Sequence, residues 1–486
     1  MSRKLEEGRA YELREEKRFP RTLRPAVHLA PRIGWMNDPN GFSRYGDRYH
    51  LFYQYNPYGT DWGAPFWGHV VSEDLVTWEH LPAALAPDEA YDRDGCFSGT
   101  AITHPDGRHM VMYTGFVLDE EDPQGRGIQC QCLAWGDGRE YVKSPANPVL
   151  TGADLPRGGD PHEFRDPRLW QEKDGTYRVL LPNNDPERGT RLLIYRSDDG
   201  ESWSSGKVFL KNEDRLGWMW ECPDLFSLDG KQVLLLSAMD EAPNKRVYAL
   251  LGEVDREKEA FLKESARILD QGFDFYAPQT VETEDGRRIL IGWLQNPDTA
   301  GDRPKDLPFC GMMSLPRELR REGGRILQRP IGELEAYRTE PVIRRDLRLE
   351  DEEIRIDGIT GRVLDLELNL RPEERGFRSF ALRFARKGDS WTEFRFEPED
   401  GLVFLDRSRA GPEKATFHRK QIKIRGNGEE LQLRMILDRY SAELFIDQGE
   451  NVLSTLVYAD SDAEDITFNV SGSAIMDIAK YGIKEK

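Results

Sequence analysis

The chain has 486 residues, a length that favours two domains, each with a core of its own. Its formal net charge of −19 argues against nucleic acid and anionic membrane surfaces as partners, because both would repel an acidic protein. The same charge makes a small neutral ligand more natural. No run of residues is long and apolar enough to cross a bilayer, so we expect no membrane partner.

Residues 1–25 alternate positive and negative charges and predict a short charged helix at the N-terminus. This segment lacks the apolar centre of a secretory signal. We therefore expect a cytoplasmic protein.

The cysteines predict neither disulfides nor a metal site. They number five, and only Cys130 and Cys132 lie close together in the sequence, which favours reduced thiols. The chain also has no Walker loop, no dinucleotide fingerprint and no HExxH motif. We expect no cofactor and no metal ion.

Residues 26–320 contain one pattern five times. Each copy has a short polar opening, a β-prone stretch, a turn rich in Asp and Gly, and an apolar run, and the copies begin at Asn37, Phe97, Arg165, Glu221 and Tyr276. An alternating strand, a short turn and a second strand are typical of a β-hairpin. Repeats of this length, with about four strands each, predict a five-bladed β-propeller.

The pattern changes after residue 320. Residues 321–344 are polar and partly helical in character and predict a linker, and residues 345–486 alternate apolar and polar side chains in several spaced runs. Such runs predict a β-sandwich of two antiparallel sheets. The expected fold class is therefore all-β, a five-bladed β-propeller followed by a C-terminal β-sandwich, and a homodimer through the sandwich is one expected role for the second domain.

Three of the five openings contain a carboxylate, namely Asp38, Asp166 and Glu221. A propeller brings the same position of every repeat to one axis. We therefore expect the three carboxylates to occupy corresponding positions and to meet there, although they come from distant parts of the chain. Negative charges gathered in one place destabilise a fold, so this arrangement indicates function.

The residues beside these carboxylates suggest that the carboxylates differ in ionisation state. Arg165 adjoins Asp166 and should keep it ionised. Glu221 stands between Trp220 and Cys222, an apolar setting that suits a general acid. Cleavage of a glycosidic bond requires at least one ionised and one protonated carboxyl group. The aromatic and amide side chains of the openings suit the binding of a sugar ring.

Six motifs are recognisable together: WMNDPNG (35–41), FYQYNP (52–57), GCFSGT (95–100), FRDP (164–167), WECPD (220–224) and DFYAPQT (274–280). They resemble the β-fructofuranosidases of glycoside hydrolase family 32, especially bacterial enzymes that hydrolyse sucrose or sucrose 6-phosphate. The resemblance spans the whole propeller and continues weakly into the sandwich, at residues 437–455. It implies a five-bladed propeller with a C-terminal β-sandwich, and a reaction with retention of configuration.

The resemblance also implies roles for individual residues. Asp38 would be the nucleophile, Glu221 the acid/base, and Asp166 a stabiliser of the transition state that binds fructose hydroxyls. The residues that would line the fructosyl pocket are Asn37, Gln54, Trp62, Phe97, Ser98, Arg165, Tyr276 and Trp293.

Two other functions compete with hydrolysis of sucrose, sucrose 6-phosphate or short fructo-oligosaccharides. A fructosyltransferase would use the same residues, with a sugar hydroxyl in place of water, and the catalytic motifs do not decide between the two. A carbohydrate-binding propeller without activity would be expected to lack Asp38 or Glu221, and both are present. The group beyond fructose stays open, because basic residues in the loops are too numerous to single out a phosphate site.

Overall fold

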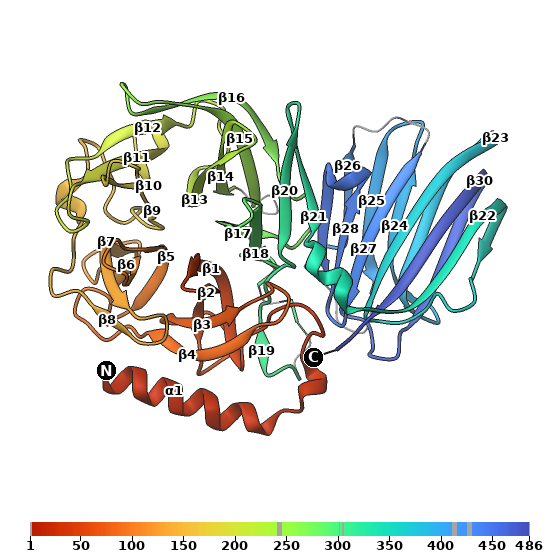
Figure 1. Cartoon of the computed structure of the whole chain (residues 1–486), viewed down its shortest axis with the longest axis horizontal. Coiled ribbons are helices and arrows are strands. Elements are labelled where there is room, and N and C mark those ends of the chain that lie inside the picture. The colour runs from red at the N-terminus through yellow and green to blue at the C-terminus, as the bar shows by residue number, and fades with distance from the viewer. Residues whose placement is uncertain are drawn as a thin grey trace.

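The computed structural model describes residues 2–240, 245–300, 302–303, 306–410, 416–424 and 430–485. Five sheets form a ring, and a C-terminal domain of long strands stands beside it (Figure 1). The predicted all-β fold, a five-bladed β-propeller followed by a β-sandwich, is confirmed. None of the helices in the described part of the chain is long and apolar enough to span a membrane.

The predicted N-terminal helix is present as α1 (Arg3–Glu15). Its first turn is capped by Ser2, whose side chain accepts a hydrogen bond from the backbone N–H of Leu5. The helix lies along the outer side of the first blade, where the buried Arg9 donates to the carbonyl of Ala83 at 2.8 Å. Two short 3-10 turns, Glu16–Arg18 and Arg21–Leu23, lead from the helix to the propeller.

Each blade is a four-stranded antiparallel sheet whose strands follow one another in the chain from the centre of the ring to its rim (Figure 1). Blade 1 consists of β1 (Gly34–Tyr45), β2 (Arg48–Asn56), β3 (Phe66–Ser72) and β4 (Glu79–Leu85). Blade 2 consists of β5 (Gly95–Thr103), β6 (His109–Leu118), β7 (Gly127–Gly136) and β8 (Tyr141–Lys143). Blade 3 consists of β9 (Arg168–Gln171), β10 (Tyr177–Asp185), β11 (Gly189–Ser197) and β12 (Lys207–Lys211).

Blade 4 consists of β13 (Met219–Leu228), β14 (Lys231–Met239), β15 (Arg246–Asp255) and β16 (Ala260–Ile268). Blade 5 consists of β17 (Tyr276–Glu282), β18 (Arg288–Trp293), β20 (Arg317–Glu322) and β21 (Arg325–Pro330). The two-residue strand β19 (Phe309–Cys310), which follows β18 in the chain, pairs in parallel with the start of β1. This pairing joins the last blade to the first.

The five predicted Asp/Gly turns join the first and second strands of the blades. Each contains a glycine with positive φ, at positions 46, 107, 175, 230 and 286. Side chains other than glycine rarely adopt this backbone conformation, so the repeated glycine fixes where each hairpin reverses.

The structure differs from the predicted linker over residues 321–344. The hairpin of β20 and β21 completes blade 5, and a 3-10 turn (Gly332–Tyr337) leads from it into the first strand of the sandwich, which begins at Arg338. The rim strands of a blade are covered on fewer sides than the central ones. They therefore carry more charged residues, and their sequence resembles that of a polar linker.

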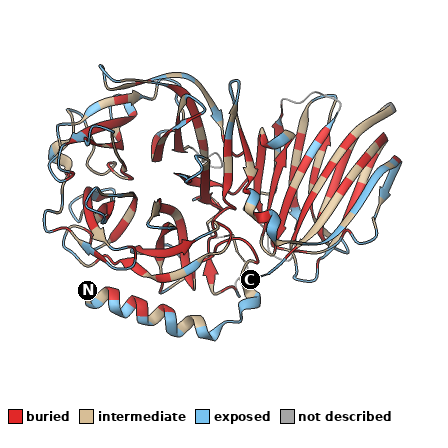
Figure 2. Ribbon diagram, in the orientation of Figure 1, coloured by how far each residue is buried: buried red, intermediate tan, exposed pale blue. Residues whose placement is uncertain are grey.

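Within its described residues the sandwich has nine strands: β22 (Arg338–Ile354), β23 (Leu364–Lys387), β24 (Ser390–Glu397), β25 (Leu402–Arg409), β26 (Arg419–Lys423), β27 (Leu431–Asp438), β28 (Ser441–Ile446), β29 (Asn451–Leu456) and β30 (Asp465–Ile483). The long strand β23 pairs with β27 through its first part, with β24 through its last part, and with β30 along most of its length. Buried side chains fill the space between the layers, whereas β22 at one edge is largely exposed (Figure 2).

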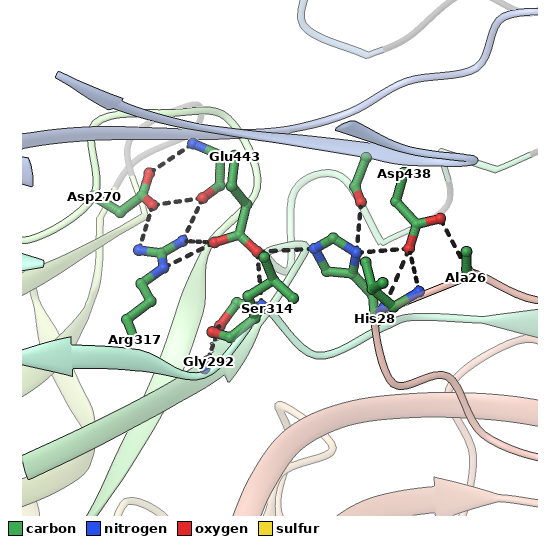
Figure 3. Close-up of polar contacts among 12 residues, drawn as sticks. Ala26, His28, Asp270, Gly292, Ser314, Arg317, Asp438 and Glu443 are labelled. Atoms are coloured by element: carbon green, nitrogen blue, oxygen red, sulfur yellow. Dashed lines mark hydrogen bonds and ion pairs between the residues drawn. The ribbon is translucent and has the colours of Figure 1, made fainter. Parts of the chain in front are cut away.

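Buried charges join the propeller to the sandwich (Figure 3). Arg317 of blade 5 contacts Glu443 of the sandwich at 2.5 Å and Asp270 at 3.0 Å. His28, on the segment that precedes blade 1, lies between Glu443, at 2.9 Å, and Asp438, at 2.8 Å. Buried charges are tolerated only when they are paired, so this network fixes the segment, the ring and the sandwich relative to one another.

Candidate active site

The openings of the five repeats lie at the centre of the ring, where β1, β5, β13 and β17 each have an irregularity. The regular pairing with the second strand shifts between Met36 and Pro39, between Cys96 and Gly99, between Glu221 and Asp224, and between Tyr276 and Gln279. Successive side chains of a regular strand point to opposite faces, but a β-bulge can turn one of them. The bulges therefore allow two consecutive residues of a blade to contribute to one site.

This arrangement corrects the expectation that the three carboxylates occupy one equivalent position. Asp38 and Asp166 are the second residues of their repeats, whereas Glu221 is the first residue of its own, level with Arg165. The second position of blade 4 is taken by Cys222. The three carboxylates still meet. Cys222 Sγ lies 3.6 Å from Asp38 Oδ2 and 3.6 Å from Asp166 Oδ2, and the charge of Glu221 raises the pKa of both aspartates.

Asp38 is held by side chains from two blades. Its Oδ2 accepts a hydrogen bond from Ser98 Oγ at 2.8 Å and one from Gln54 Nε2 at 3.4 Å, and Gln54 also donates to Ser98 at 2.6 Å. Burial and the nearby charge of Glu221 raise the pKa of Asp38 to about 6, against the opposing effect of the hydrogen bonds from Ser98 and Asn37. The carboxyl is therefore mostly ionised at neutral pH.

Asp166 has a left-handed backbone, with φ of 61°. Its N–H donates to Thr114 Oγ1 at 3.0 Å, and its Oδ2 accepts from the backbone N–H of Cys222 at 3.0 Å. Burial raises its pKa to about 7, and the opposing charge of Arg165 is too weak to offset this. Arg165 acts in the predicted direction but does not hold the pKa of Asp166 at its usual value.

Glu221 is the partner that Arg165 binds. Arg165 donates to Glu221 Oε1 from Nε at 3.1 Å and from Nη2 at 2.9 Å, and it also pairs with Glu163. The hydroxyl of Tyr276 donates to Glu221 Oε2 at 2.7 Å. Trp220 points away and packs between blades 3 and 4, so the apolar setting predicted for Glu221 is replaced by two hydrogen-bonding partners.

The remaining predicted binding residues differ in how far they are exposed. Phe97 is partly exposed at the axis, as are Asp38, Arg165 and Glu221. Trp62 lies on a loop of blade 1, is 53% exposed, and meets Phe97 edge-on at 6.0 Å between ring centroids. Those buried around the axis are Asn37, Gln54, Ser98, Tyr276 and Trp293.

Trp293 is almost fully covered by its neighbours. It is 2% exposed and packs edge-on against Trp35 at 5.9 Å, and Trp35 in turn donates to Asn37 Oδ1 at 2.7 Å. Its contact with the sugar stays a prediction.

Sequence reasoning missed Cys222, Thr114 and Glu163. Cys222 could have been found by aligning the five openings, because it occupies the position of Asp38 in blade 4. Thr114 and Glu163 carry no such signal, since one lies on a second strand and the other just before an opening. All five cysteines are buried and unpaired. Among the described residues, no group of three or more His, Cys, Asp or Glu side chains is arranged to hold a metal ion.

Comparison with known proteins identifies the family. The glycosyl hydrolases family 32 N-terminal domain matches residues 28–330, and the family 32 C-terminal domain matches residues 333–484. A sucrose-6-phosphate hydrolase of Bacillus subtilis is 34% identical over 97% of both chains, and one of Escherichia coli is 32% identical over 94% of both. A β-fructofuranosidase of Bombyx mori has the same fold, with a TM-score of 0.83 and 32% identity over 99% of this chain and 98% of that one. The chain belongs to glycoside hydrolase family 32.

Proposed function

We propose that the protein is a retaining β-fructofuranosidase that hydrolyses the terminal fructosyl bond of sucrose, sucrose 6-phosphate or short fructo-oligosaccharides. The observation that carries this proposal is the meeting of Asp38, Asp166 and Glu221 at the axis, around Cys222 and Arg165. The hydrolase names of the relatives support hydrolysis over fructosyl transfer.

In the first step, the ionised Asp38 attacks the anomeric carbon of fructose. Glu221 gives its proton to the departing glycosidic oxygen, so the bond breaks without release of an alkoxide. In the second step, Glu221 takes a proton from water, which displaces Asp38 and releases fructose. Two inversions at the same carbon retain its configuration.

Asp166 serves the oxocarbenium-like transition state. Its pKa of about 7 means that it exchanges a proton easily near neutral pH, and it can form strong hydrogen bonds with fructose hydroxyls. Phe97 and Trp62 offer aromatic surface to the sugar, whereas Ser98 and Gln54 act mainly by orienting Asp38.

The cytoplasmic location and the homodimer remain part of the proposal. In the described part of the sandwich, β22 pairs with β30 on one side and has no partner strand on the other, so a second copy could associate there. Light scattering at several protein concentrations tests this association.

Substitution of the two proposed catalytic residues tests the function. Asp38→Ala should abolish turnover of every substrate, including p-nitrophenyl β-D-fructofuranoside. Glu221→Ala should lose roughly 10²- to 10⁴-fold on sucrose and much less on the nitrophenyl fructoside, whose leaving group needs little protonation. Asp174→Ala, in the exposed turn of blade 3, is the matched control and should behave as wild type.

Equal losses on both substrates in Glu221→Ala would contradict its role as the acid. The same assays with sucrose and sucrose 6-phosphate, compared by kcat/KM, determine whether a phosphate is preferred.

A further inference from the structure

Residues 269–275 connect blade 4 to blade 5, and the sandwich holds their backbone. The N–H of Gln271 donates to the carbonyl of Val452 at 2.8 Å, and those of Phe273 and Asp274 donate to the carbonyl of Ser454 at 2.9 and 3.2 Å. Val452 and Ser454 lie on β29, so the connection runs along this strand almost as a further strand would.

A glycine makes this close approach feasible. A Cβ atom at Gly272 would lie 2.1 Å from the carbonyl oxygen of Ser454 and 2.2 Å from its nitrogen, which no side chain could tolerate without a shift of the backbone. The position of the connection is therefore set by direct backbone contact with the sandwich.

Side chains strengthen the attachment. Phe273 belongs to the propeller but is buried in the core of the sandwich, where the guanidinium of Arg407 lies 4.4 Å above its ring. Arg407, on β25, contacts the carboxylate of Asp274 at 2.5 Å, and the side chains of both residues are fully buried. Asp274 also accepts hydrogen bonds from the N–H of Leu456 and the hydroxyl of Thr299, both at 2.8 Å.

The connection ends at the active site. Tyr276, two residues after Asp274, donates its hydroxyl hydrogen bond to Glu221 at 2.7 Å. Phe275 between them is buried, with the guanidinium of Arg317 4.4 Å above its ring. Two residues span at most about 7 Å of extended chain, so a displacement of Asp274 reaches Tyr276 with little to absorb it.

We propose that Arg407 is a positioning residue of the active site: through Asp274 it fixes residues 270–275 and thereby places the hydroxyl of Tyr276 against Glu221. The sandwich then takes part in catalysis by orienting the acid/base, in addition to any role in stability or association. This inference rests on the proposed role of Glu221 as the proton donor.

Four variants test the proposal. Arg407→Met removes the charge but keeps an apolar stem over Phe273, and Arg407→Lys restores the charge. Tyr276→Phe removes the hydroxyl directly. Arg395→Met is the matched control. Arg395 lies on β24, the strand next to that of Arg407, and its ion pairs are with Glu393 and Glu397 of the same strand. Each variant is assayed on sucrose and on p-nitrophenyl β-D-fructofuranoside.

Arg407→Met should lower kcat on sucrose by roughly 10- to 100-fold with little change in KM, because misplacement of a catalytic group by about 1 Å has effects of this size. The loss on the nitrophenyl fructoside should be much smaller, and Arg407→Lys should recover part of the activity. The double variant with Tyr276→Phe should be no slower than Tyr276→Phe alone, since both changes remove the same contact. A purely structural role would affect both substrates alike.

Wild-type kcat in Arg407→Met, an equal loss on both substrates, or additive losses in the double variant would each overturn the proposal. If Arg407→Met does not fold, Lys420→Met takes its place, because Lys420 donates to the carbonyl of Gly272 at 2.5 Å and should give the same pattern in a weaker form. Glu221→Ala separates the two hypotheses. If Glu221→Ala loses as much activity on the nitrophenyl fructoside as on sucrose, the proposed function fails. If Glu221→Ala shows the smaller loss on the nitrophenyl fructoside but Arg407→Met does not, only the role of Arg407 fails.

Discussion

His28 should make the stability of the protein depend on pH, and His28→Gln should remove this dependence. Both ring nitrogens contact buried carboxylates, Asp438 at 2.8 Å and Glu443 at 2.9 Å, and the side chain is fully buried. Burial alone would lower the pKa of His28, but the hydrogen bonds that its ring donates to the two carboxylates, together with their charges, outweigh it and raise the pKa to about 9. The charged imidazolium therefore stabilises the folded state.

The magnitude follows from the difference between the folded and unfolded states. An unfolded histidine has a pKa near 6.5, so a folded value of about 9 corresponds to about 3 kcal/mol of stability. Because the folded pKa is the higher one, this contribution is fully present below pH ~6.5 and is lost as the pH rises through about 9.

Urea unfolding of wild type and His28→Gln at pH 6 and at pH 10 measures the effect. The difference in unfolding free energy between the two proteins should be about 3 kcal/mol larger at pH 6 than at pH 10. Groups that titrate elsewhere affect both proteins equally and cancel. A difference that is the same at both pH values would refute a charged His28 in the folded protein.

Two further substitutions probe the site and the domain junction. Ser98→Ala removes a hydrogen bond that lowers the pKa of Asp38, so this pKa should rise further above about 6. The acidic limb of the pH profile of kcat/KM should then move to higher pH. An unmoved limb would count against Asp38 as the ionised nucleophile. Gly272→Ala should destabilise the protein by about 1–3 kcal/mol through overpacking against Ser454. Gly332→Ala is the control, because Gly332 faces open space. Equal melting temperatures of the two variants would contradict the close packing at Gly272.

The sequence was a good guide to the propeller because its signals are local. Each blade begins with an alternating strand and a turn whose glycine has positive φ, and these features depend on a few neighbouring residues. The rim hairpin of blade 5 was missed for the opposite reason. Its first strand, β20, is recognised only through its pairing with β18, and β21 only through its pairing with β20, and no short stretch of sequence encodes either pairing.

The carboxylates of the site were predicted, but their surroundings were not. Glu221 stands one position away from Asp38 and Asp166 in the repeat. The bulges of β1 and β13 and the left-handed backbone of Asp166 accompany the meeting of all three. The partner of Arg165 was also not predicted. Side chains of neighbouring residues point in different directions, and the guanidinium of Arg165 reaches Glu221 rather than the adjacent Asp166. Pairs such as His28 with Asp438 join distant parts of the chain and leave no mark in the sequence.

The pairing of β19 with β1 has a consequence for synthesis on the ribosome. Asp38 emerges early, but the ring cannot close until Phe309 and Cys310 have been made and have paired with the start of β1. The residues of the sandwich that hold the connection before Tyr276 emerge later still. A nascent polypeptide that ends before Phe309 therefore carries the nucleophile in an open ring, and we expect hydrolytic activity only after the ring has closed.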